Sequence, residues 1–253
     1  MRKNVPAHLN HSLLQRLFVV ASLVASASSA LAQQLLAPAE VVLYVHSDLK
    51  STDFIRPLVC ALQRVLAAPV STQISNLRLG PELLATPTQF DVGKVADLFI
   101  QATAANGSSL SFKYLLIPYD LKAEPWRYVF STSFGSDTTP YHVGVVSTAR
   151  LDVENPIKQH HQGSEITATR AYKLILKSIA RVAGLKSPDD CILAFPKSLD
   201  ELDRKSPEFC PGDRATLIKA GILNAREGQQ GTDCMAIARA GPMDLRMAAG
   251  HSP

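Results

Sequence analysis

Apolar residues along this chain form two kinds of pattern that alternate with each other. Five short segments have the β-branched and apolar composition of strands. These segments are residues 40–46, 71–79, 111–118, 127–135 and 142–151. The fourth of them alternates between apolar and polar residues, which is typical of a half-exposed strand at the edge of a sheet.

Three further segments repeat apolar side chains every three to four positions, as helices do. They are residues 51–68, 90–104 and 164–183. Asp91 is a candidate cap for the second helix, and Gly184 is the expected C-terminal cap of the third. The order strand, helix, strand, helix, strands, helix predicts an α/β fold, with a mixed sheet and helices packed on it.

The predicted strands and helices all lie within residues 40–223, which we expect to form one domain. Residues 152–163 inside this domain are polar, and we expect them to form a loop. Residues 224–253 are rich in Gly, Ala and short polar stretches, which indicates a loosely packed C-terminal tail.

The first 32 residues have the layout of a secretory signal peptide. A basic stretch precedes the apolar run 17–24, and small residues end in the A-x-A pattern at 30–32. This run is shorter than the roughly 20 residues of a membrane-spanning helix. We therefore expect cleavage after residue 32 and a short leader over 33–39. The mature protein would be periplasmic or secreted, with no membrane span.

Removing this segment changes the charge of the chain. The full sequence has 26 Lys and Arg against 22 Asp and Glu. Three of the basic residues and none of the acidic ones lie in residues 1–32, which leaves 23 against 22, a net charge of +1. A nearly neutral mature chain gives no compositional support for a nucleic-acid partner.

Two segments carry a family resemblance. Residues 198–211, SLDELDRKSPEFCP, are similar to the S-L-x-E-x-D-R-K-x-x-x-F-C-P-x-C segment of the archaemetzincin family of zinc metallopeptidases. Residues 177–187, KSIARVAGLKS, have the spacing of that family's HExxHxxGxxH helix, and Gly184 falls on its glycine. The resemblance covers roughly residues 40–220 and implies a metzincin-like single domain.

The resemblance also shows what is missing. In the family, three His hold a catalytic zinc, and the Glu activates the zinc-bound water. Here Lys177, Ser178, Arg181 and Ser187 occupy the His, Glu, His and His positions. Lys and Arg are cations without a free lone pair, and Ser cannot serve as the carboxylate base. We therefore expect no catalytic residue, metal site or cofactor at this motif, although active family members require zinc.

Four basic residues recur along one side of the last predicted helix: Arg170, Lys173, Lys177 and Arg181. The simpler interpretation is a solvated helix face, which predicts an exposed Lys173. The residues expected to be buried opposite this face are Leu174, Ile175 and Ile179. The alternative is an anion-binding groove in the former substrate cleft, for a group such as a peptide carboxylate.

A replacement catalytic set is not evident in the sequence. His160 and His161 with Glu165 resemble a weak metal set, but a polar surface loop explains them more simply. Lys177 would act as a base only if burial lowered its pKa strongly.

The resemblance places Cys191 and Cys210 at two of the four ligand positions of a second, structural zinc. The other two positions fall near Pro188 and at Asp213, and Leu193 falls at the family's turn methionine. Two thiolates cannot complete a tetrahedral site. In an oxidising compartment their proximity favours a disulfide, with two buried thiols as the alternative. The pairing of the remaining two cysteines stays open.

Two functions follow as hypotheses. The first is an exported, catalytically inactive homologue that acts as a binding or regulatory module. Its ligand is unknown, with a peptide or protein in the former substrate cleft as the candidate. The second is an active peptidase or hydrolase of the same family that uses other residues. The zinc content of the purified protein discriminates between them.

Overall fold

The computed structural model describes residues 35–106, 108–135, 141–151, 160–225 and 234. The predicted signal peptide at 1–32 lies outside these residues, as does nearly all of the predicted tail. Among the described residues, no helix combines the length and apolarity needed to cross a membrane.

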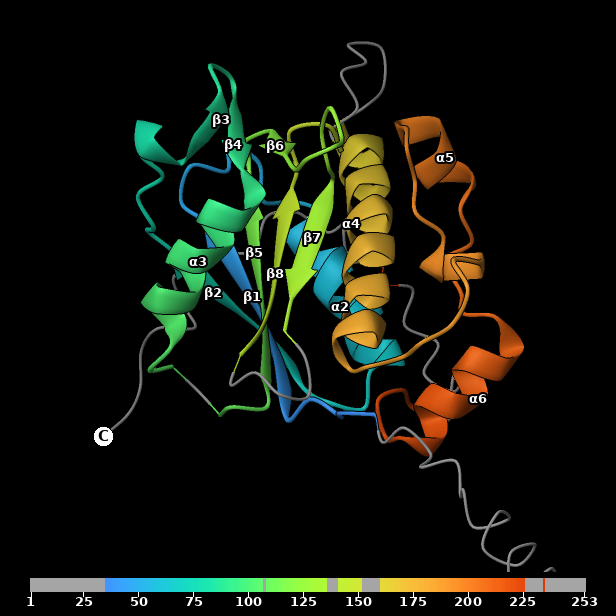
Figure 1. The fold of residues 1–253 in the computed structure, drawn as a ribbon. Coiled ribbons are helices and arrows are strands. Elements are labelled where there is room, and N and C mark those ends of the chain that lie inside the picture. Colours follow the sequence, from blue (N-terminus) through green and yellow to red (C-terminus); the bar gives the residue numbers. More distant parts are fainter. Residues whose placement is uncertain (1–34, 107, 136–140, 152–159, 226–233, 235–253) are drawn as a thin grey trace, which may run out of the picture. The chain divides into compact units, whose positions relative to one another are not determined.

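A five-stranded mixed sheet forms the centre of the domain, in the order β2-β1-β5-β8-β7 (Figure 1). Its strands are β1 (Glu40–His46), β2 (Val70–Ser75), β5 (Ser111–Ile117), β8 (His142–Ser147) and β7 (Ser131–Phe134). The first four run parallel, and β7 pairs with β8 in the antiparallel direction at one edge. The central strands are buried on both faces, which explains their continuous apolar runs.

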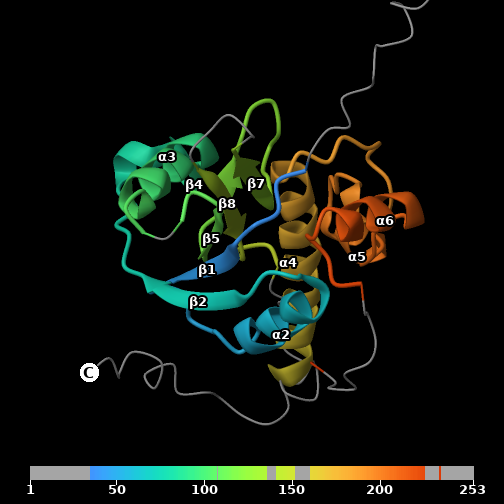
Figure 2. The same ribbon diagram turned by 90° about the horizontal axis from the view of Figure 1, so that it is seen from below.

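Helices cover both faces of this sheet. α2 (Ile55–Val65) and α4 (His160–Val182) lie side by side on one face, and α3 (Val92–Thr103) lies on the other (Figure 2). Alternate residues of each strand therefore enter different cores. Val41, for example, packs in the core between the sheet and the helices α2 and α4, whereas Val42 packs in the core between the sheet and α3.

Short elements complete the domain. A small second sheet joins β3 (Leu84–Thr86), β4 (Gln89–Asp91) and β6 (Leu121–Lys122), next to the 3-10 turn η2 (Pro81–Leu83). After α4 the chain forms η3 (Cys191–Leu193), α5 (Leu199–Arg204) and α6 (Pro211–Lys219).

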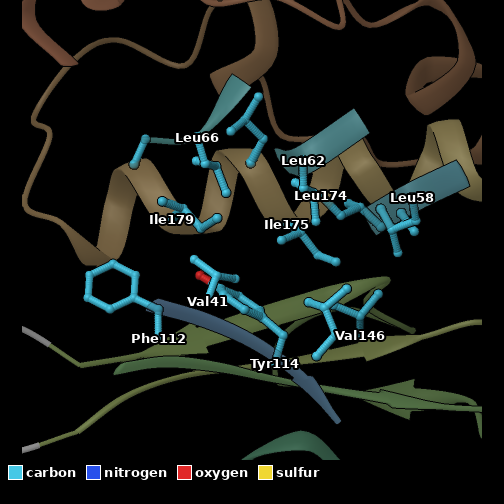
Figure 3. Close-up of a cluster of buried hydrophobic side chains, with 14 of the residues drawn as sticks. Val41, Leu58, Leu62, Leu66, Phe112, Tyr114, Val146, Leu174, Ile175 and Ile179 are labelled. Carbon is cyan, nitrogen blue, oxygen red and sulfur yellow. The ribbon is translucent and has the colours of Figure 1, made fainter. Parts of the chain in front are cut away.

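The predicted α/β architecture is confirmed, and several local predictions are confirmed with it. The range of β1 is as predicted, Asp91 caps α3 by accepting from two backbone N–H groups, and Gly184 follows α4 with a φ of 96°. Leu174, Ile175 and Ile179 of α4 are buried in the core that α4 forms with α2 and the sheet (Figure 3).

The beginning of α4 was placed too late by the sequence pattern. The helix starts at His160, inside the segment 152–163 that we expected to be a loop. Gly163 sits within the helix and does not interrupt it, because one glycine in a long helix costs only about 1 kcal/mol. β2 and β7 are shorter than the predicted strands 71–79 and 127–135, since each strand ends where its pairing ends.

Tyr114 on β5 requires a glycine beside it. Its ring lies across β8 at Gly144, where an added Cβ would be 2.4 Å from two ring carbons. The Tyr114 side chain is fully buried under α4 (Figure 3). A residue without a side chain at position 144 therefore lets the ring fill the space between sheet and helix.

We expect Gly144→Ala to lower the free energy of unfolding by about 1–3 kcal/mol, because the ring or the strand must move to admit the methyl group. Gly212→Ala on α6 is the matched control, since its added Cβ would meet no atom within 4 Å. Urea denaturation of both variants measures the difference. Equal stability of the two would contradict the packing described for Tyr114.

Candidate functional site

A cleft lies along α4 on the side of the edge strand β7. Its volume is about 420 Å³, and it is lined by α4, by β7 and by the segments 126–130 and 195–197. α4 and the segments 126–130 and 195–197 each contribute apolar residues, for example Leu174, Phe130 and Phe195, while β7 contributes the polar Ser131 to Ser133. The volume lies in the range of about 300–1,000 Å³ that is common for ligand pockets.

The charge of the cleft has one sign. Its lining contains four cationic residues: Arg127, Lys177, Arg181 and Lys197. No Asp or Glu is among the described residues that line it. Three positions of the degenerate zinc motif meet here, because Lys177, Ser178 and Arg181 all line this cleft.

The fourth position does not join them. Ser187 lies beyond the end of α4, and its hydroxyl donates to Asp213 Oδ1 of α6 at 2.5 Å. Gly184 likewise lies outside the cleft lining and ends the helix. The residue set that the family spacing would bring to one metal is therefore divided between two places in this protein.

Lys177 is only partly satisfied in the cleft. Its ammonium donates to the Ala194 carbonyl at 3.3 Å and lies 5.1 Å from the centre of the Phe195 ring. Burial lowers the pKa of Lys177, and the nearby Arg181 lowers it further against the opposing effect of Asp189. The amine is half-buried and has no carboxylate partner within the described part of the chain.

Arg181 is held by its own neighbours. Its guanidinium donates to Asp189 Oδ1 at 2.6 Å and to the Leu185 carbonyl at 3.0 Å. Both contacts lie within eight residues along the chain, so they also close the turn after α4. A guanidinium used in this way is a cationic wall of the cleft and offers no lone pair to a metal.

Ser178 occupies the position of the general base, and its surroundings do not activate it. The hydroxyl donates to the Tyr114 hydroxyl at 3.2 Å, and both groups are buried. Burial raises the pKa of Tyr114 above its usual range, so the phenol stays neutral. A pair of neutral hydroxyls has no general base to deprotonate water or Ser178.

A catalytic zinc does not fit these residues. Lys177 and Arg181 present N–H donors where a metal needs lone pairs, and Ser187 is bonded to α6. His160 and His161 begin α4, and their side chains lie outside the described part of the structure.

The expectation of a solvated face on α4 is wrong. Lys173 is only 5% exposed, and its ammonium donates to the carbonyls of Leu202 and Asp203 at 2.9 Å each. Arg170 is also buried and forms a two-pronged ion pair with the Asp203 carboxylate, at 2.7 and 2.6 Å. α5 covers this part of α4, and the helical period alone could not show which later segment would pack there.

Lys205, the residue that follows α5, is a buried cation that the sequence pattern did not single out. It is 7% exposed, and its Nζ has no hydrogen-bond partner in the described structure. Burial lowers the pKa of Lys205 to about 7, with further lowering by Lys177 and Lys173 and a smaller opposing effect of Asp189. The Lys205 amine is therefore close enough to the charges of Lys177 and Lys173 on α4 to be affected by both.

Cys191 and Cys210 are joined by a disulfide, with their Cα atoms 5.5 Å apart, as the resemblance led us to expect. A carboxylate oxygen of Asp190 lies within 4.8 Å of both sulfurs. Because the sulfurs are bonded to each other, neither is a thiolate, and one carboxylate alone does not hold a structural zinc. Leu193, at the turn-methionine position, is buried in the core.

A second disulfide settles the pairing that the sequence left open. Cys60 of α2 is bonded to Cys234, 174 residues later, with a Cα–Cα distance of 5.5 Å. Cys234 is buried, so this point of the predicted tail is packed against the domain. The tail is also held at Asn224, whose amide donates to the Leu66 carbonyl at 2.7 Å.

Known proteins resemble this chain in the sequence around the cleft and in the fold. The sequence profile of peptidase family M54 matches residues 127–218, which include β7, β8, α4 and α5. The archaemetzincin of Aeropyrum pernix is 31% identical over 91 residues, which are 35% of this chain and 45% of that protein. The chain thus spans less than half the length of this curated relative.

Solved structures extend the likeness to most of the domain. The crystal structure of archaemetzincin from Methanopyrus kandleri aligns with a TM-score of 0.56 and 21% identity, over 72% of this chain and 94% of that one. The zinc-dependent peptidase from Methanocorpusculum labreanum aligns with a TM-score of 0.54 and 26% identity, over 70% and 99%. Nearly the whole of each neighbour is therefore matched by this fold.

Both disulfides can be tested on the purified protein. We expect peptide mapping without reduction to recover Cys191 linked to Cys210 and Cys60 linked to Cys234. The paired replacement Cys191→Ala with Cys210→Ala should cost about 3 kcal/mol of unfolding free energy, by the chain-entropy estimate for a loop of this length. Alkylation of all four cysteines before reduction would contradict the pairing.

Lys205 predicts a pH-dependent stability. The pKa of Lys205 is about 7 in the folded protein and has the ordinary lysine value of 10.5 in the unfolded chain. Between these two pH values the unfolded chain therefore binds more protons than the folded protein. The free energy of unfolding should rise with pH in this window, by at most about 1.4 kcal/mol per pH unit. Below pH 7 the amine is charged in both states, so the full cost of burying its charge is then present.

Lys205→Met keeps the aliphatic part of the side chain and removes the charge. We expect this variant to be more stable than the wild type below pH 7 and to lose part of the rise in stability at higher pH. Lys219→Met, on the exposed side of α6, is the control. Urea denaturation across the window measures the slope, and parallel curves for wild type and Lys205→Met would contradict the assignment.

Proposed function

The chain belongs to the archaemetzincin family of metallopeptidases, and from this premise we propose that it acts as a non-proteolytic binding module. The observation that carries the proposal is the state of the motif positions. Lys177 and Arg181 line the cleft as cations, the Ser178 hydroxyl is hydrogen-bonded to the neutral phenol of Tyr114, and the Ser187 hydroxyl is hydrogen-bonded to Asp213 of α6. This arrangement supports neither a catalytic zinc nor a general base.

The proposal includes export to the periplasm or the medium. Two observations support it: the signal-peptide layout of residues 1–32 and the two disulfides that use all four cysteines. Disulfides form and persist in oxidising compartments and are rare in the cytosol. The loss of a structural zinc is offset by the link between Cys191 and Cys210, which holds together the segment that follows α4.

A peptide is the class of ligand that the cleft favours. β7 is the edge strand of the described sheet and pairs there with β8 alone. Three of its residues, Ser131 to Ser133, line the cleft. An open strand edge accepts an extended peptide through backbone hydrogen bonds, with neighbouring pockets taking its side chains. Binding without cleavage uses the same cleft that a peptidase would use for its substrate.

Metal analysis and a peptidase assay test the proposal together. We expect the purified oxidised protein to contain well below one zinc per chain and to show no peptide hydrolysis that a chelator abolishes. The variant with Lys177→His and Arg181→His places two imidazoles on the cleft side of α4, so it should bind more zinc than the wild type without gaining chelator-sensitive hydrolysis, because position 187 lies apart from them. Zinc near one per chain in the wild type, with hydrolysis lost to chelator and restored by zinc, would overturn the proposal.

A further inference from the structure

The positive charge of the cleft lacks a counterpart. Four cationic side chains line it, without an acidic residue among its described lining. The carboxylate of Asp189 forms an ion pair with Arg181, but its side chain is 60% exposed and it does not line the cleft. A cleft of one sign, with apolar walls that strengthen electrostatic attraction, favours an anionic group in its ligand.

Among the cations in the described lining, Lys177 combines partial burial with unused hydrogen-bonding capacity, whereas Arg127 and Lys197 are exposed to water. An ammonium has three N–H donors, and the described structure gives this one a single long hydrogen bond to Ala194 and a ring contact to Phe195. It is half-buried, and burial has already lowered its pKa. A carboxylate beside Lys177 would supply the missing counter-charge and a charge-assisted hydrogen bond.

An aromatic pair lies next to this ammonium. Trp126 and Phe195 are 41% and 39% exposed, and their ring centres are 5.0 Å apart. Both line the cleft, and Phe195 also contacts Lys177. Two neighbouring large apolar side chains at a cleft are a place where a ligand's apolar group gains contact area.

From this juxtaposition we infer that the cleft binds the C-terminal end of a peptide, with the terminal carboxylate on Lys177 and an apolar last side chain against Trp126 and Phe195. The inference rests on the proposed binding function and names the part of the peptide that is recognised. The rest of the peptide extends along the open edge of β7. These backbone contacts should make a peptide bind more tightly than a small carboxylic acid, which cannot reach the strand.

The cleft contains its own reporter. Trp126 is the only tryptophan in the chain, and it lines the cleft with a half-exposed ring. Its fluorescence should therefore change when a ligand covers it. The probes are an N-acetylated tetrapeptide that ends in Phe with a free carboxylate, the same peptide as its C-terminal amide, and N-acetylphenylalanine.

We expect the free-carboxylate peptide to bind about 10- to 100-fold more tightly than the amide, as hydrogen bonds to charged groups commonly provide. Lys177→Met should remove most of this preference and leave the weak binding of the amide unchanged. Lys219→Met, on α6 and outside the cleft lining, should bind both peptides as the wild type does.

Each result separates this inference from the proposed function. Equal affinity for the free-carboxylate peptide and the amide would overturn the role of Lys177. The proposed function, peptide binding without zinc and without cleavage, would not be affected by that result. N-acetylphenylalanine binding as tightly as the peptide would overturn the assignment to a peptide end. A retained preference in Lys177→Met, with native circular dichroism, would place the carboxylate on another residue and so also overturn it. Zinc-dependent hydrolysis alone would overturn the proposed function.

Discussion

The two-pronged ion pair between Arg170 and Asp203 fixes the part of the chain on which the cleft depends. It joins α4 to α5 from a buried position, and Lys173 adds hydrogen bonds to two carbonyl groups at the end of α5. A buried guanidinium needs a partner, since an unpaired charge in the interior is far costlier than a paired one. This pairing holds α5 on the helix, and through it the turn that carries Phe195 into the cleft.

Two of the motif positions on α4 carry cationic side chains in place of metal ligands. The family resemblance implies a zinc cation where Lys177 and Arg181 now project. Two organic cations replace it, so the cleft still attracts negative charge. A metal also polarises a carbonyl and activates water. The Lys177 ammonium, hydrogen-bonded to the Ala194 carbonyl, and the Arg181 guanidinium, hydrogen-bonded to Asp189, do neither. In the function that we propose, recognition is kept without catalysis, because the two depend on different properties of the same positions.

The sequence predicted the elements whose burial depends on local pattern. β1 was placed correctly because six consecutive residues are buried on both faces of the sheet. Features that depend on distant partners were missed. Lys173 is hydrogen-bonded to residues about 30 positions away, and the pairing of Cys60 with Cys234 spans 174 residues. The motif positions were readable in sequence through the family spacing, but Trp126 lies in a loop whose sequence has no periodicity to indicate a cleft.

The disulfide between Cys60 and Cys234 makes the greater part of the domain a covalent ring. Every strand except β1 and every helix after α2 lies between its two ends, and the link between Cys191 and Cys210 forms a smaller ring inside it. A single peptide-bond break anywhere between Cys60 and Cys234 leaves the two pieces connected through sulfur. If the protein is exported as we propose, one cut by a protease outside the cell opens the ring without releasing a fragment.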